Sequence, residues 1–210
     1  MRKDERSPLE EVTDRILLMY LINKATNCGD IDGDTKLQKL VFLSERKMVL
    51  SKLKGFNFYF YKFIHGPFSK ELENDLGVLE EWGAYLPDEY MLTSAGRKAI
   101  DLLPEIWSRN SDTISNIDAI ANRFAHQSLR SILIYVYNLE HPFYESKMKI
   151  IDLKPHTPIL FKMKESKAEM LFTITESELE TMDILLDYDT YSDLIDPDGD
   201  VDESVPYPGV

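Results

Sequence analysis

The chain has 210 residues, of which 43% are hydrophobic, and a formal net charge of -13 at pH 7. This length and composition are sufficient to bury one core, and the single cysteine, Cys28, excludes an intramolecular disulfide. The longest apolar runs, Ile16–Ile22 and Ile132–Tyr137, are far shorter than a membrane span, and no apolar leader segment follows Met1. These features predict a soluble cytoplasmic protein and exclude a membrane partner.

The negative charge is concentrated towards the C-terminus. Residues 1–175 contain 24 basic and 25 acidic residues, which gives a net charge of -1. Residues 176–210 contain 12 acidic residues and no basic residue, which gives a net charge of -12. We therefore expect a nearly neutral body with an acidic tail that acts as a separate electrostatic element.

Two helices are predicted at the N-terminus. Ser7 and Pro8 are the residue types favoured at the N-cap and at the first position of a helix. A loop rich in glycine and aspartate follows at 29–33, and Asp34 is expected to cap a second helix that runs to about Leu53. Apolar residues at helical spacing place one face of each helix in the core.

Basic residues of the second helix gather within about 100° of its circumference. One interpretation is an ordinary solvated helix face. The other is a basic stripe that binds phosphates or an acidic partner protein. The residues of this predicted stripe are Lys36, Lys39, Arg46, Lys47 and Lys54.

An aromatic segment at 56–64 predicts a β-strand. Aromatic residues occupy both odd-numbered and even-numbered positions, so we expect the strand to be covered on both sides. Gly66 and Pro67 are expected to end the strand in a tight turn. Ser69 can then cap a helix that runs through Trp82.

This helix and the short hairpin predicted after it, at 85–92, are acidic. The helix contains one basic residue, Lys70, and five acidic residues. Asp88 and Glu89 occupy the expected tip of the hairpin. Because phosphates would repel both elements, we expect DNA binding through them to be weak or absent.

The remaining elements of the body are shorter. Thr93 can cap a helix that ends at Pro104, and two further helices are predicted at about 114–124 and 128–138. After residue 148 the pattern changes from helical to extended. Short strands are predicted there at 150–153, 159–163 and 170–173.

The acidic tail begins with a predicted helix. Thr175 and Glu178 form a capping box, and the residues beyond it alternate between acidic and apolar types, as in segments that become ordered on a partner. The alternatives are a tail that only aids solubility, or one that folds back on the predicted basic stripe. The residues expected to contact a partner protein are Leu179, Met182, Leu186, Tyr188, Tyr191, Leu194 and Ile195.

No catalytic or metal-binding motif is present in the sequence. The four histidines are not spaced as zinc ligands, and there is no glycine-rich phosphate loop or nucleophile elbow. The acidic run at 196–202 lacks the glycine and the glutamate of an EF-hand loop. His65 precedes the Gly66–Pro67 turn and is expected to bond to the turn backbone. We therefore expect no enzyme activity, no cofactor and no metal.

The order of the predicted elements is typical of a winged helix-turn-helix. The sequence also resembles the Panacea-type (SocA-like) antitoxin domain and related uncharacterised winged-helix proteins of bacteria and archaea. The similarity extends to about residue 148. Its matching residues are Lys36–Leu40, Phe63, His65, Gly66, Pro67, Phe68, Ser69, Leu79, Gly83, Leu92, Thr93, Gly96, Tyr135–Tyr137, Pro142, Ser146 and Lys147.

The predicted fold class is mainly α with small β elements. We expect a winged-helix domain with a helical extension at 1–147, a small β/α appendage at 148–190 and an acidic tail at 191–210. The resemblance implies an interaction module that binds and neutralises or controls a toxin-like partner protein. The alternative is a winged-helix transcriptional regulator that binds DNA through the predicted basic stripe. Pairing with a second copy as a homodimer is left open in either case.

Overall fold

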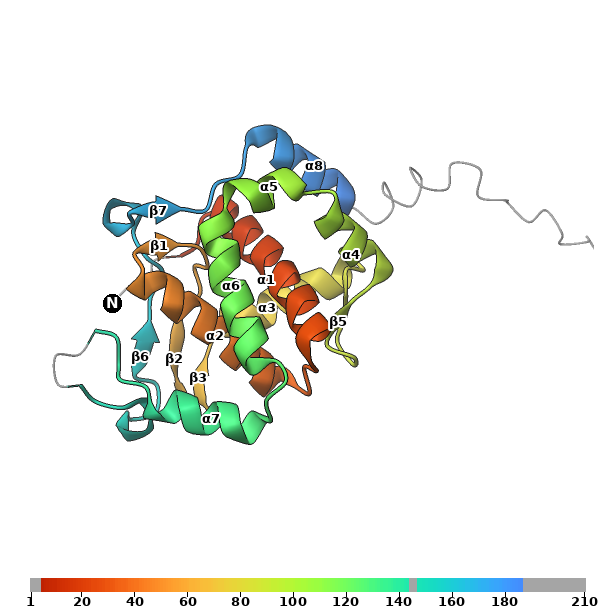
Figure 1. The fold of residues 1–210 in the computed structure, drawn as a ribbon. Helices are drawn as coiled ribbons and strands as arrows, with labels where there is room; N and C mark the ends of the chain where they lie inside the picture. The colour runs from red at the N-terminus through yellow and green to blue at the C-terminus, as the bar shows by residue number, and fades with distance from the viewer. Residues whose placement is uncertain (1–4, 144–146, 187–210) are drawn as a thin grey trace, which may run out of the picture.

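The computed structural model describes residues 5–143 and 147–186 (Figure 1). Within these ranges the chain is mainly helical with small β-sheets, which confirms the coarse fold class. The helices are α1 Pro8–Cys28, α2 Asp34–Leu50, α3 Lys70–Glu81, α4 Ser94–Asp101, α5 Pro104–Arg109, α6 Ser111–Phe124, α7 Leu129–Asn138 and α8 Glu176–Leu186. The strands are β1 Leu53–Lys54, β2 Phe60–Phe63, β3 Gly66–Phe68, β4 Tyr85–Leu86, β5 Met91–Leu92, β6 Pro158–Leu160 and β7 Met170–Leu171, with 3-10 helices η1 Ile150–Asp152 and η2 Glu165–Lys167.

Helices α1, α2 and α6 form the centre of the molecule. α6 packs against both α1 and α2, and α7 packs against α2 as well (Figure 1). Leu17 of α1, Phe42 of α2 and Phe124 of α6 are buried in the shared core. The helical spacing of apolar residues that predicted a core face on the first two helices is therefore confirmed.

The start of α1 follows the predicted cap. The hydroxyl of Ser7 accepts a hydrogen bond from the Glu10 backbone N at 3.2 Å, and the Glu10 carboxylate accepts one from the Ser7 backbone N at 2.9 Å. Pro8 is the first helical residue, where its missing N–H has no helical partner to lose.

The bounds of α2 differ from the prediction at both ends. Gly33 rather than Asp34 is the N-cap residue, and it has a φ of 137° that a side chain would disfavour. The helix ends at Leu50, a few residues before the predicted end near Leu53. Leu53 instead belongs to β1, because this segment pairs with β7 in a parallel two-stranded sheet.

The aromatic segment forms an antiparallel hairpin of β2 and β3. Tyr61 lies opposite Phe68, and the turn falls at 64–65. Gly66 and Pro67 therefore begin the second strand, so the prediction that they form the turn is wrong. Pro67 is tolerated because β3 is an edge strand of the β3-β2-β6 sheet, where a missing N–H disrupts the fewest ladder bonds.

The region predicted as a C-terminal appendage completes sheets that begin in the preceding residues. β6 pairs antiparallel with β2, and β7 pairs parallel with β1. The strand predicted at 150–153 is wrong, because this segment forms the 3-10 helix η1. The described part of 148–190 thus shares its sheets with the predicted 1–147 domain.

The elements around α3 and α4 follow the predicted pattern. Ser69 and Thr93 cap these helices by accepting bonds from the backbone N of Leu72 at 3.3 Å and of Gly96 at 3.0 Å. β4 and β5 form the short hairpin between the two helices. Pro104 was predicted to end the helix that Thr93 caps, which in the structure ends at Asp101. Pro104 instead begins a further helix, α5, which was not predicted from the sequence.

A buried ionic cluster ties α1 and the segment before it to α3. The Asp75 carboxylate of α3 accepts hydrogen bonds from Arg6 at 2.5 Å and from Arg15 at 3.1 Å. Arg6 also donates to Asp14 at 2.8 Å, and Asp14 accepts a bond from the Asn57 backbone N at 2.7 Å. These charge-assisted bonds compensate the two buried carboxylates for the water they lose.

Burial changes the protonation of the acidic side chains nearby. It raises the pKa of Asp14 to about 7 and, helped by Asp14 itself, raises the pKa of Glu45 well above its ordinary value. Burial acts in the same direction on Glu10, but hydrogen bonds from Lys162 and Lys54 outweigh it and hold the Glu10 pKa at about 2. Glu10 is therefore a fixed anion that anchors two lysines.

Residues 187–210, which include most of the predicted acidic tail, lie outside the described residues. Within 5–143 and 147–186, none of the helices combines the length and apolar character that would be needed to cross a lipid bilayer.

Candidate interaction surface

The segment Lys36–Leu40 of α2 and the segment Phe63–Ser69 are in direct contact. Gln38 of α2 pairs with the Ser69 backbone in both directions: its Nε2 donates to the carbonyl O, and its Oε1 accepts from the N, each at 2.9 Å. The Lys39 Nζ donates to the carbonyl O of Pro67 at 2.7 Å. These buried bonds hold β3 and the start of α3 against α2.

Gly66 of β3 lies beside Lys39 of α2 and Tyr137 of α7. Its φ of 90° belongs to the region that favours glycine. A Cβ added there would lie 3.3 Å from Tyr137 Cε1 and 3.6 Å from Lys39 Cε. The position therefore requires glycine for its backbone conformation and offers little room for a side chain.

We expect Gly66→Val to lower the free energy of unfolding by about 1–3 kcal/mol, because valine is strained at positive φ. Urea unfolding followed by circular dichroism measures this loss. Gly77→Val is the matched control, since Gly77 lies within α3 and an added Cβ would meet nothing within 4 Å. An unchanged midpoint for Gly66→Val would show that the site is not strained.

A cavity of about 140 Å³ opens beside Lys39. Burial, with a smaller contribution from the charge of Lys62, lowers the pKa of Lys39 to about 7. Because the amine is bonded to the Pro67 carbonyl, we assign Lys39 the role of holding β3 in place. The residues that line the cavity are Asp34, Thr35, Gln38, Lys39, Phe63, His65, Gly66 and Phe68.

The cavity offers no evident metal site. In the part of the chain that the structure describes, no group of three or more His, Cys, Asp or Glu side chains is arranged to hold a metal ion. His65 lies exposed in the turn between β2 and β3.

The predicted basic stripe is not a surface feature. Lys36, Lys39 and Lys54 are only 3%, 2% and 8% exposed. Lys54 also lies in β1 rather than in α2, so it is not on the predicted helix face. The other two residues, Arg46 and Lys47, are half-buried. The prediction of an exposed stripe is therefore wrong for the three lysines, whether its role was solvation or phosphate binding.

Helix α3 presents fewer acidic groups than the sequence suggested. Asp75 is buried in the ionic cluster, and the Glu71 carboxylate accepts a hydrogen bond from the Tyr59 backbone N at 2.7 Å. The surface of α3 is nevertheless acidic. Its exposed carboxylates are Glu73, Glu80 and Glu81.

Ring side chains from β2 and the residue before it, from β3, from the segments around β6 and from the segment after α7 form one continuous surface, which we term the aromatic face. Neighbouring ring centroids within it are 5.3 to 6.2 Å apart, the range in which aromatic rings attract one another. The rings therefore fix one another in place. The aromatic face consists of Tyr59, Tyr61, Phe63, Phe68, Phe143, His156 and Phe161.

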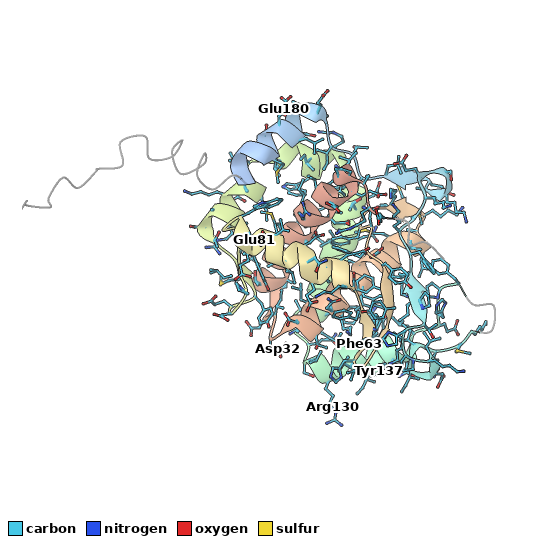
Figure 2. All side chains as sticks on the ribbon, turned by 180° about the vertical axis from the view of Figure 1, so that it is seen from behind. Asp32, Phe63, Glu81, Arg130, Tyr137 and Glu180 are labelled. Atoms are coloured by element: carbon cyan, nitrogen blue, oxygen red, sulfur yellow. The ribbon has the colours of Figure 1, made fainter. Side chains whose placement is uncertain are left out.

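Both ends of the aromatic face are open to solvent. Phe63 is 38% exposed at one end, and Phe161 and Phe143 are 37% and 51% exposed at the other. Figure 2, which views the molecule from behind, shows Phe63 at the surface. By contrast, Phe58 and Phe60 are fully buried. The prediction that the aromatic strand is covered on both sides is therefore correct only for its inner side.

A second cavity, of about 280 Å³, lies at the Phe161 end of the aromatic face, and we term it the basic pocket. Four of its lining residues are apolar and three are lysines. Lys162 donates to Glu10 at 2.9 Å, whereas Lys164 and Lys167 are exposed. The lining residues are Val49, Phe143, Phe161, Lys162, Met163, Lys164 and Lys167.

The sequence contains a signal for this pocket that the chain-wide charge count conceals. Residues 147–167 include six lysines and only two acidic residues, in a chain whose net charge is -13. Exposed aromatic residues within the same stretch would have identified it as a basic, aromatic surface.

Helix α8 contains three of the residues predicted to contact a partner protein, Leu179, Met182 and Leu186. Met182 is 1% exposed and belongs to the core, so its prediction as a partner contact is wrong. Leu179 is half-buried, and Leu186 ends the helix. Two hydrogen bonds between Arg109 and Glu178, one of them 2.8 Å long, fasten α8 to α5.

The predicted capping box of α8 is confirmed, since the Thr175 backbone N donates to the Glu178 carboxylate at 2.7 Å. The other predicted partner contacts lie outside the described residues. These are Tyr188, Tyr191, Leu194 and Ile195.

Comparisons with known proteins give no assignment: no protein-family model, no curated protein and no solved structure matches the chain.

Proposed function

We propose that this protein is an antitoxin-like or regulatory interaction module that binds a partner protein and thereby neutralises or controls it. The observation that carries the proposal is the aromatic face. Phenylalanine and tyrosine are enriched in the buried centres of protein interfaces, and exposed apolar patches of this kind mark binding surfaces. The aromatic face offers such a centre with its rings already ordered by mutual packing.

The surroundings of the aromatic face favour a partner with an acidic surface. Lys164 and Lys167 are exposed at its Phe161 end, and Lys154 is exposed in the segment before β6. Cations at the rim of an apolar patch speed association with an anionic partner and select against a cationic one.

The rival function is DNA binding by a winged-helix regulator. In that prediction the basic stripe binds the DNA phosphates, and the burial of Lys36, Lys39 and Lys54 weighs against such binding. The acidic surface of α3 and of the β4–β5 hairpin weighs against it as well, because both would repel phosphates. Protein binding is the function that these observations support better.

The test is co-expression with the product of the adjacent reading frame, as the candidate toxin-like partner. We expect the wild-type chain to restore growth and to bind that product in calorimetry. Phe63→Glu combined with Phe161→Glu should weaken binding by at least about tenfold, since each change places a charge in an apolar interface.

The matched control is Leu102→Glu, which places the same charge on a 56% exposed leucine at the end of α4. It should bind and rescue like the wild type. Equal rescue by the aromatic-face variant would contradict the proposed surface. Sub-micromolar, sequence-selective DNA binding in an anisotropy titration would instead support the regulator.

A further inference from the structure

We propose that the basic pocket is a binding site for an acidic segment that carries apolar residues, and that its occupant is the distal part of this chain's own tail, residues 200–207. The tail would then compete with a partner protein for one end of the aromatic face, a role that rests on the proposed function. The docking itself can be measured without any partner.

The chemistry of the basic pocket defines its occupant. Val49, Phe143, Phe161 and Met163 supply apolar lining, while the three lysines supply positive charge beside it. Glu10 already neutralises one of these lysines, Lys162. Lys164 and Lys167 are exposed at the two ends of η2, and the nearest acidic residues in the sequence are Glu165 and Glu169, of which Glu169 is paired with Lys52. A ligand that places apolar groups between carboxylates would satisfy both parts of the pocket.

The chain itself contains a segment of that chemistry. Residues 187–210 include eight acidic residues and no basic one. Val201 stands directly between Asp200 and Asp202, and Val205 and Tyr207 follow within a few residues. The carboxylates complement the lysines, and the apolar side chains match the lining of the pocket.

The distance from the end of α8 to the basic pocket favours the distal part of the tail over the proximal part. The C-terminal end of α8 lies at the upper right of Figure 1, whereas β6 and β7, between which residues 161–167 of the pocket fall in the chain, lie on the left. A domain of this size spans roughly 40 Å, and each extended residue adds about 3.3 Å, so about 12 residues after Leu186 are needed to cross it. Tyr188 and Tyr191 are too close to α8 to reach the pocket, and residues beyond about 198 are far enough.

Attachment to the same chain favours this occupant over a free one. Docking of a tethered segment is intramolecular, so it does not depend on the protein concentration. Nucleic acid would need a longer track of cations, whereas Glu10 already neutralises Lys162 and leaves Lys164 and Lys167 as the other lysines that line the pocket. The bound tail would cover Phe143 and Phe161, and a partner that uses the aromatic face would have to displace it.

Zero-length carbodiimide cross-linking of the full chain tests the proposal. The reagent joins a lysine amine to a carboxylate only when the two are in contact. We expect links from Lys164 and Lys167 to Asp200, Asp202 or Glu203, identified by mass spectrometry. Mixing ¹⁴N and ¹⁵N protein distinguishes links within one chain from links between chains, and raising the salt concentration should reduce the yield.

Paired variants of the tail that keep every charge make the test specific. Val205→Ser with Tyr207→Ser removes two apolar side chains from the docking segment and should lower the yield of these links by about tenfold, the equivalent of about 1.4 kcal/mol. Tyr188→Ser with Tyr191→Ser makes matched changes too close to α8 to matter and should leave the yield unchanged.

Three results would overturn the inference. Links to the exposed Lys98 as abundant as those to Lys164 would show unspecific attraction. Links that join ¹⁴N to ¹⁵N chains would assign the pocket to a second copy. Binding of a single-stranded oligonucleotide that Lys164→Glu with Lys167→Glu abolishes, without intrachain links, would make it a nucleic-acid site. Growth rescue by the wild-type chain is a separate experiment. Absence of the cross-links would contradict the docking but not the proposed function, and absence of rescue would contradict the proposed function but not the docking.

Discussion

Asp75→Ala is expected to lower the free energy of unfolding by about 3–5 kcal/mol, the loss that follows when one partner is removed from a buried ion pair. The Asp75 side chain is 1% exposed, and those of Arg6 and Arg15 are 7% and 16% exposed. Without the carboxylate, Arg15 keeps its bond to the partly exposed Glu11 and its contact with the Trp82 ring. Arg6 keeps Asp14 and its contact with the Phe58 ring. Uncompensated buried charge, rather than lost packing, is the reason for so large an effect.

Glu73→Ala provides the matched control for this prediction. Glu73 lies two residues earlier in α3, and its ion pair with Lys70 joins two side chains that are 52% and 62% exposed. Exposed pairs of this kind contribute less than about 1 kcal/mol. Chemical denaturation of both variants measures the difference, and a loss for Asp75→Ala no larger than that for Glu73→Ala would contradict the role of the cluster.

Four helix N-caps could be predicted from the sequence because capping is a local interaction, although Gly33 rather than the predicted Asp34 caps α2. Ser7, Ser69, Thr93 and Thr175 each accept a hydrogen bond from a backbone N three residues ahead in the chain. The residue type and its spacing to the helix are sufficient to recognise such a cap.

The aromatic face could be predicted only in part. Alternation along the strand separates Phe58 and Phe60 from Tyr59, Tyr61 and Phe63, and the structure keeps that separation. Which of the two sides stays open depends on α2 and on β6, which is about a hundred residues away in the chain. No pattern within the strand contains that information.

The burial of the basic residues could not be predicted for a related reason. Helical spacing correctly places Lys36 and Lys39 on α2, but their charge suggests exposure. Lys39 is buried because the β2–β3 hairpin closes over it and offers the Pro67 carbonyl as a partner. Likewise, the acidic sequence of α3 gives no sign that Arg6 and Arg15 lie opposite Asp75.

Lys39→Met is expected to remove a rise in stability with pH that the wild-type protein shows between about pH 7 and pH 10. Burial, with help from Lys62, lowers the pKa of Lys39 in the folded protein to about 7, whereas an unfolded lysine titrates near 10.5. Between these values the unfolded chain binds the proton and the folded chain does not. Raising the pH therefore favours the folded state, by up to about 1.4 kcal/mol per pH unit from this one group.

Below about pH 7 the amine is charged in both states, so its contribution no longer changes with pH and its burial costs the folded protein the most. The quantity to measure is the difference in unfolding free energy between wild type and Lys39→Met, from urea titrations at several pH values between 6 and 10, because other groups titrate equally in both proteins. That difference should shift in favour of the wild type as the pH rises. Lys98→Met, a matched change at an exposed position of α4, controls for the loss of one lysine side chain. A difference for Lys39→Met that stays flat with pH would mean that the Lys39 amine stays protonated in the folded protein, held by more than the Pro67 carbonyl.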